Sequence, residues 1–201
     1  MDRFLVLFTM TFCLVSWAPV SGASEMDAMP EEIMPVDGMK KSDSSEWGVS
    51  HSAKAEITAT DTASSLKGRV DFVETGDGVQ VVANLANVAP AGKHGFHIHE
   101  NGSCEDGGKA AGGHFNPASA KHGLLPRDGH ESAHAGDMGN IEIGDNGSGS
   151  LVLFLPGLNL SKDANNITGK AVIVHEKEDD FGQPTGNAGG RIGCGLIILN
   201  K

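Results

Sequence analysis

The sequence predicts an all-β fold, an eight-stranded antiparallel Greek-key β-barrel or sandwich with long loops. Three observations support this prediction. Apolar residues repeat with a period of two rather than 3.6, which is typical of strands with one buried face. Glycine is abundant, at 28 of 201 residues, and supplies many turns, whereas no segment has a long amphipathic helix pattern. Aromatic residues make up only 5% of the chain, so we expect a core built mainly of Val, Ile, Leu and Ala.

Each strand follows from its own pattern. Apolar and polar residues alternate over 53–59, 66–72 and 79–85, and a Gly-Asp-Gly turn separates the second stretch from the third. Five further short strands are predicted at Gly95–His99, Asn140–Ile143, Ser150–Phe154, Lys170–His175 and Gly193–Leu199. The stretch from Cys104 to Asp137 is too long and irregular to be a simple connection. Loops of that length inside compact domains are usually functional.

The N-terminal residues 1–23 have the features of a signal peptide. Arg3 precedes an apolar run from Phe4 to Ala18, and Ser21-Gly22-Ala23 supplies the small residues of a cleavage site. The alternative, an uncleaved anchor helix, is less favoured because the run is short for a membrane span. We therefore expect an exported protein, periplasmic or extracellular, with no membrane attachment after cleavage. Cleavage removes Cys13 and leaves Cys104 and Cys194, which we expect to form a disulfide in an oxidising compartment.

Residues 24–48 form an acidic, methionine-rich linker that we expect to be disordered. Its methionines at 26, 29, 34 and 39 offer thioethers, which are soft ligands suited to Cu(I). Residues 49–201 form the single folded domain. The formal net charge of the whole chain is −11, which argues against nucleic acid as a partner because phosphate binding relies on clustered Lys and Arg.

Seven potential metal ligands lie within the folded domain. His97 and His99 are two apart in a predicted strand, so both imidazoles leave the same face and can converge on one metal ion. The others are His114, His122, His134, Asp137 and His175. A single histidine is more often a surface or core residue without metal, but the set as a whole indicates metal binding. Four imidazoles suit copper or another nitrogen-preferring transition metal, whereas histidines with one carboxylate suit zinc. The spacing alone does not divide the seven between two sites.

Five motifs resemble the copper/zinc superoxide dismutase family, in order and over essentially all of 49–201. They are Gly95-Phe96-His97-Ile98-His99-Glu100, Gly112-Gly113-His114-Phe115-Asn116-Pro117, Lys121-His122-Gly123, His134-Ala135-Gly136-Asp137 and the run from Gly186 to Gly195. The resemblance implies dismutation of superoxide, a small anionic substrate, to dioxygen and hydrogen peroxide at a copper ion that is alternately reduced and reoxidised. It also implies that zinc is structural. By resemblance, copper is held by His97, His99, His114 and His175, and zinc by His114, His122, His134 and Asp137, with His114 as a bridging imidazolate that can also carry a proton.

The resemblance extends to residues around the metals. Arg191 resembles the family's cationic guide for the anionic substrate, and Asp179 the carboxylate that hydrogen-bonds one histidine of each metal. The segment from 180 to 186, which belongs to the electrostatic loop, is short and lacks the additional Glu and Lys residues of many relatives. Which lysine compensates, for example Lys177, is left open. His51 and His94 are expected to be bystanders.

Two other classes of function are weighed against the enzyme. A protein that stores or delivers copper and zinc would bind metal without turnover and would be indifferent to replacement of Arg191. A structural secreted β-sandwich, in which metal only holds a long loop in place, would bind zinc alone and give no redox signal. The histidine quartet together with Arg191 favours the enzyme. The apolar run Leu196–Leu199 is compatible with a homodimer as well as with a buried terminal strand.

Overall fold

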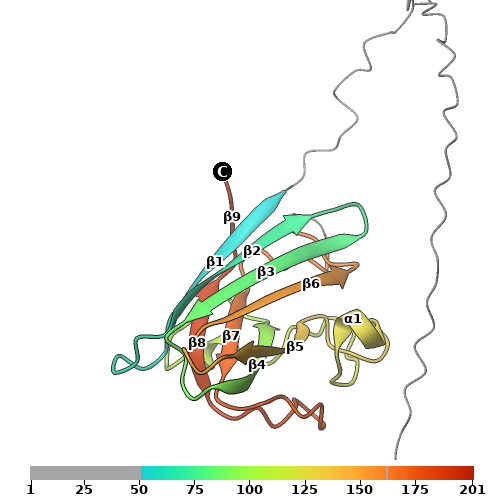
Figure 1. Cartoon of the computed structure of the whole chain (residues 1–201). Coiled ribbons are helices and arrows are strands. Elements are labelled where there is room, and N and C mark those ends of the chain that lie inside the picture. The colour runs from blue at the N-terminus through green and yellow to red at the C-terminus, as the bar shows by residue number, and fades with distance from the viewer. Residues whose placement is uncertain (1–50, 162) are drawn as a thin grey trace, which may run out of the picture. The chain divides into compact units, whose positions relative to one another are not determined.

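The computed structural model describes residues 51–161 and 163–201, and the predictions for residues 1–48 lie outside that range. The described chain forms antiparallel strands that curl into a nearly closed barrel (Figure 1). The strands are β1 (Ser52–Ala59), β2 (Lys67–Glu74), β3 (Gly78–Ala86), β4 (Gly92–His99), β5 (Asp137–Ile143), β6 (Gly149–Pro156), β7 (Ala171–His175), β8 (Arg191–Leu196) and β9 (Ile198–Leu199). The helices are a 3-10 turn η1 (Lys109–Ala111) and α1 (Leu125–Asp128). Neither is long and apolar enough to span a bilayer.

The strand order confirms the predicted all-β barrel. Hydrogen bonds join the strands in the order β5-β4-β7-β8-β1-β2-β3-β6, and contacts between β5 and β6 close the barrel. The prediction differs from the structure at the last strand, which the sequence pattern predicts as one continuous strand, Gly193–Leu199. The chain instead leaves β7 after Leu196, which pairs with Ala171, and Ile198 then pairs with Lys54 of β1. Ile197 between them is fully buried and donates its N–H to the carbonyl of Lys170, so the strand divides into β8 and β9.

The period-two pattern sets which side chains form the core. In β1, Ala53, Ala55 and Ile57 are buried, whereas the intervening Glu56 is exposed. The same alternation in β2 and β3 fills the barrel with Val70, Phe72 and their partners. Aliphatic residues dominate this core, as the composition predicts, with Phe72 and Phe96 as its largest fully buried side chains. Hydrophobic burial of this kind provides the main favourable free energy of folding.

Strand β4 departs from this pattern, because every residue from His94 to His99 is buried. Phe96 and Ile98 belong to the barrel core. The opposite face, with His97 and His99, is covered by the long loop between β4 and β5. The peptide N–H of Phe115 donates to the carbonyl of Ile98 at 2.8 Å, and the N–H of Ile98 donates to the carbonyl of Gly136 at 2.9 Å, so two points of this loop are hydrogen-bonded to Ile98 near the end of β4. The imidazoles therefore lie in a closed space between barrel and loop.

Candidate metal centre

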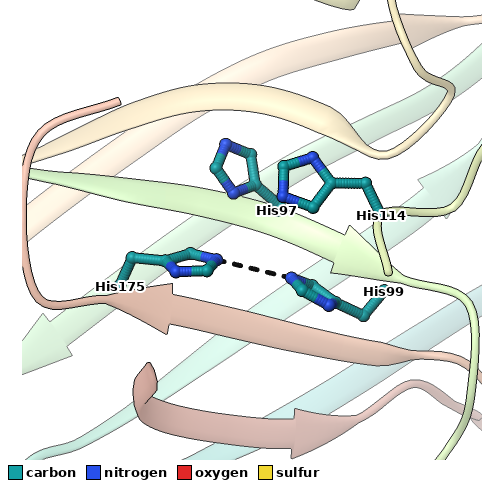
Figure 2. Close-up of side chains that lie close together, drawn as sticks. All are labelled: His97, His99, His114 and His175. Atoms are coloured by element: carbon teal, nitrogen blue, oxygen red, sulfur yellow. Dashed lines mark hydrogen bonds between the residues drawn. The ribbon is translucent and has the colours of Figure 1, made fainter. Parts of the chain in front are cut away.

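Four histidines from three segments converge beside β4 (Figure 2). His97 and His99 leave one face of β4, His175 ends the neighbouring strand β7, and His114 comes from the long loop. All four are buried, and one nitrogen of each lies within 4.8 Å of the others. His99 Nε2 and His175 Nε2 are 3.4 Å apart, and the ring centroids of His97 and His114 are 4.2 Å apart. Several imidazole nitrogens can thus face one point.

Burial keeps three of these imidazoles uncharged near neutral pH. It lowers the pKa of His97 to about 4, of His99 to about 2 and of His175 to about 3. The hydrogen bond between His97 and Asp179 opposes this shift without reversing it. A metal ion is bound by the neutral imidazole, whose free lone pair is the ligand. We define His97, His99, His114 and His175 as the first cluster. Its members His97, His99 and His175 therefore offer nitrogen ligands without the need to displace an imidazolium proton.

A second cluster shares His114 and adds His122, His134 and Asp137, all of them buried. Asp137 lies at its centre. Its Oδ1 is 2.8 Å from His114 Nδ1 and 3.2 Å from His134 Nδ1, and its Oδ2 is 2.9 Å from His122 Nδ1. Although burial raises the pKa of Asp137, the adjacent imidazoles of His114, His122 and His134 lower it well below its usual range. Three imidazoles around one carboxylate form a donor set typical of zinc.

Asp179 links the two clusters, because its carboxylate contacts one histidine of each. Its Oδ2 lies 2.8 Å from His97 Nε2, and both its oxygens lie 3.0 Å from His122 Nε2. The carboxylate is completely buried. Burial lowers the pKa of His122, but the carboxylates of Asp137 and Asp179 outweigh it and raise that pKa to about 9. The pocket thus holds two buried carboxylates that favour a positive charge between them, which a bound cation supplies.

Two buried nitrogens indicate that metal ions belong here. Among the described residues, neither His97 Nδ1 nor His122 Nδ1 makes a hydrogen bond. His122 Nδ1 is close to Asp137 Oδ2, but the two atoms are not oriented as a hydrogen bond. Buried polar atoms without partners are rare in proteins and require an explanation. Coordination explains both, because each unpaired nitrogen belongs to a ring whose other nitrogen is held by Asp179. The residues therefore fit a pair of nitrogen-preferring metal ions.

Arg191 lies at the entrance to the first cluster. It lines a cavity of about 190 Å³ together with His99, His114, His175, Thr185 and Asn187. Its Nη1 donates to the carbonyl of Gly108 at 2.5 Å and its Nη2 to that of Gly112 at 2.6 Å. These bonds hold the guanidinium in one orientation beside the imidazoles. A larger cavity of about 350 Å³, lined by Leu124, Met138 and Phe181 among others, contains none of the histidines.

The predicted disulfide is confirmed. Cys104 and Cys194 are bonded and close a loop across 90 residues. Cys194 is on β8, three residues after Arg191, and Cys104 begins the segment that carries Gly108 and Gly112. The bridge therefore connects the strand that carries the arginine to the loop whose carbonyls orient it.

Some residues near the clusters were not indicated by the sequence. His94, expected to be a bystander, is buried, with Nδ1 2.8 Å from the carbonyl oxygen of His175. Asn140 and Gln183 form side-chain hydrogen bonds to the backbones of Asp179 and His122, respectively. Neither amide belongs to a ligand-like motif, and the contacts join segments far apart in the chain. His51, in contrast, lies away from the histidine clusters, beside Glu74.

Comparisons with known proteins agree with this geometry. The family described as copper/zinc superoxide dismutase matches residues 66–197. A crystal structure of the clock protein EA4 is similar over 74% of this chain and 94% of its own, with 35% sequence identity and a TM-score of 0.66. The family match covers most of the barrel, both histidine clusters, the disulfide and Arg191. The chain therefore belongs to the copper/zinc superoxide dismutase family, whose members use copper and zinc to dismute superoxide.

Proposed function

We propose that the first cluster holds copper, that the second holds zinc, and that His114 bridges the two ions as an imidazolate. The observation that carries this assignment is the membership of His114 in both clusters. Its Nδ1 lies beside Asp137, which leaves Nε2 for the first cluster. The rings of His97 and His122 are both hydrogen-bonded to Asp179, and each has an unpaired Nδ1. These two nitrogens support the assignment, because each can supply one ligand, His97 to copper and His122 to zinc.

The bound copper would supply the one-electron chemistry by which one superoxide leaves as dioxygen and a second becomes hydrogen peroxide after taking up two protons. His114 Nε2 is suited to take up one of these protons in one half of the cycle and to deliver it in the other. Asp137 and the second cluster hold the opposite nitrogen, so the ring keeps its position while the proton moves. Zinc has no redox chemistry, and its proposed role is to hold this ring.

The function is tested by dismutation assays on the full chain loaded with copper and zinc, copper alone, or zinc alone. We expect rapid turnover with both metals and none with zinc alone. Metal analysis should show one copper and one zinc per chain. Tight uptake of both metals without turnover would favour storage or delivery instead, and uptake of zinc alone would favour a structural metal site.

Arg191→Ala is expected to lower kcat/KM for superoxide by about tenfold or more, because electrostatic attraction to a fixed charge raises the encounter rate of a small anion. The copper and zinc content should be unchanged, since Arg191 contacts backbone carbonyls rather than ligands. Stopped-flow decay of superoxide at two ionic strengths checks this. Added salt should slow the wild-type protein more than the variant, and equal salt dependence would contradict the guiding role.

We also propose a homodimer formed through the end of β8 and β9. Leu196 is 37% exposed and Ile198 is 59% exposed, and the two lie two residues apart on adjoining strands. Ile198→Asp is expected to convert a dimer into a monomer in sedimentation velocity runs at micromolar concentration. Val152→Asp, at a comparably exposed position on β6, should leave the assembly intact. A wild-type protein that sediments as a monomer would contradict the proposal.

Export is proposed on the signal-like sequence of residues 1–23, and the Cys104–Cys194 disulfide is compatible with an oxidising compartment, periplasmic or extracellular. Binding of Cu(I) by the methionines of 24–48 is likewise a proposal. These segments, and the domain boundary at residue 49, lie outside the described residues. The substrate steering proposed for Lys177 is supported by its side chain, which lies beside Gly189 at the edge of the Arg191 cavity.

A further inference from the structure

The side chain of Gln183 pairs with the backbone of one residue of the second cluster. Its Oε1 accepts the N–H of His122 at 3.1 Å, and its Nε2 donates to the carbonyl of His122 at 2.9 Å. A primary amide presents one donor and one acceptor side by side, so it can satisfy both polar groups of a single residue's backbone. Both contacts span 61 residues of sequence and join the 180–186 segment to the long loop.

His122 needs such support more than the first-cluster ligands that lie on the barrel strands. His97, His99 and His175 lie on strands, where ladder hydrogen bonds fix their backbones. His122 lies between strands, in a part of the loop without helix or strand. Its imidazole must nevertheless face Asp137 with one nitrogen and Asp179 with the other. A shift of the His122 backbone would therefore displace the imidazole from both carboxylates.

The partner carboxylate is held by a second amide in the same way. Asn140 Nδ2 donates to the carbonyl of Asp179 at 2.9 Å, and the N–H of Asp179 donates to Asn140 Oδ1 at 2.7 Å. The contact between His122 and Asp179 is therefore held at each end by one side-chain amide that pairs with the backbone. Asn140 reaches from β5, whereas Gln183 reaches from the 180–186 segment.

The rest of the 180–186 segment packs around the same imidazole. The Phe181 ring is stacked with that of His122, with centroids 6.5 Å apart and planes inclined by 21°. Gly186 is buried, and a Cβ there would overlap the Asp179 carboxylate and lie 2.7 Å from His122 Nε2. The segment thus contacts the backbone of His122 through Gln183 and its ring through Phe181, and Gly186 leaves the space that the Asp179 carboxylate and His122 Nε2 occupy.

We propose that Gln183 is a positioning residue that sets the geometry of His122 and thereby retains the zinc ion. This inference rests on the proposed zinc site and adds a role for the short 180–186 segment, which contributes little charge for substrate steering. Partners outside the ligand shell typically affect metal affinity by about 10-fold to 100-fold. The same range is expected here for the loss of both hydrogen bonds.

The test uses the full chain loaded with copper and with either zinc or cobalt(II) in the second cluster. Gln183→Ala removes both hydrogen bonds, and Gln183→Glu keeps the acceptor but places a carboxylate against the carbonyl of His122. We expect Gln183→Ala to release zinc to a chromophoric chelator about tenfold faster than the wild type. Both variants should shift the visible cobalt spectrum, which reports coordination geometry. Gln80→Glu and Gln80→Ala, at an exposed position on β3, are the matched controls and should change neither measurement.

Three outcomes would overturn the proposal. Zinc release and cobalt spectra equal to those of the wild type would show that His122 holds its position without Gln183. A fall in melting temperature of the metal-free protein as large as that of the loaded protein would show a general structural role. Failure of the wild type to take up cobalt would overturn the zinc site itself, and the role of Gln183 with it. The last outcome tests the proposed function separately from the variants.

Discussion

His97→Ala is expected to abolish measurable dismutation, a loss of about 100-fold or more, because it removes one copper ligand from a buried set of four. The substitution also leaves Asp179 without one of its two histidine partners. A buried carboxylate that loses a hydrogen-bond partner is destabilised, so His122 on the zinc side should be affected as well. Copper content by elemental analysis and superoxide decay by stopped flow check the two parts of the expectation.

The matched control is His51→Ala, which removes an imidazole that lies beside Glu74, away from the histidine clusters. It should retain wild-type copper content and turnover. Retention of more than a tenth of wild-type turnover in His97→Ala would mean that the first cluster is not the copper site as assigned. Loss of turnover in both variants would point to general sensitivity of the fold rather than to coordination.

The barrel is predictable from the sequence because its information is local. Alternation in β1, β2 and β3 shows which side chains are buried, and the glycine-rich turns mark where strands end. The metal clusters are indicated for a related reason, because His97 and His99 share a strand face and the remaining ligands lie in motifs that resemble one family. The final strand, predicted to be continuous, divides at Ile197, whose side chain is buried in the core and whose peptide groups hydrogen-bond to Gly169 and Lys170 in the loop that precedes β7.

Among the supporting residues, Asp179 was indicated by resemblance, whereas Gln183, Asn140 and His94 could not be predicted, because their roles depend on contacts between distant segments. Gln183 belongs to no ligand-like motif in the sequence and acquires a role only when it meets the backbone of His122. His94 lies beyond a register shift in β4 between Gly95 and His97, and no alternation rule predicts its face across such a bulge. Its contact with the carbonyl of His175 comes from the neighbouring strand. Pattern analysis therefore indicates ligands better than it indicates what holds them.

Removal of the disulfide by Cys104→Ser together with Cys194→Ser is expected to destabilise the metal-free protein by about 2–5 kcal/mol. The bond closes a loop across 90 residues, and without it the unfolded chain gains the conformational entropy that closure had removed. For a domain of this size the melting temperature should fall by about 5–15 °C. Calorimetry and guanidinium unfolding of the metal-free protein measure the effect apart from the contribution of the metals.

The same substitution should also lower dismutation by the metal-loaded protein, because the bridge anchors the segment whose carbonyls orient Arg191. Gly108 and Gly112 accept from the two terminal nitrogens of the guanidinium, and both follow Cys104 within eight residues. Without the bridge this segment is held to β8 mainly through Arg191 itself, so the charge loses its fixed orientation. Ser103→Ala, next to the bridge, is the control and should keep wild-type kcat/KM. If the double variant is less stable but has wild-type kcat/KM and salt dependence, the disulfide stabilises the fold without positioning Arg191.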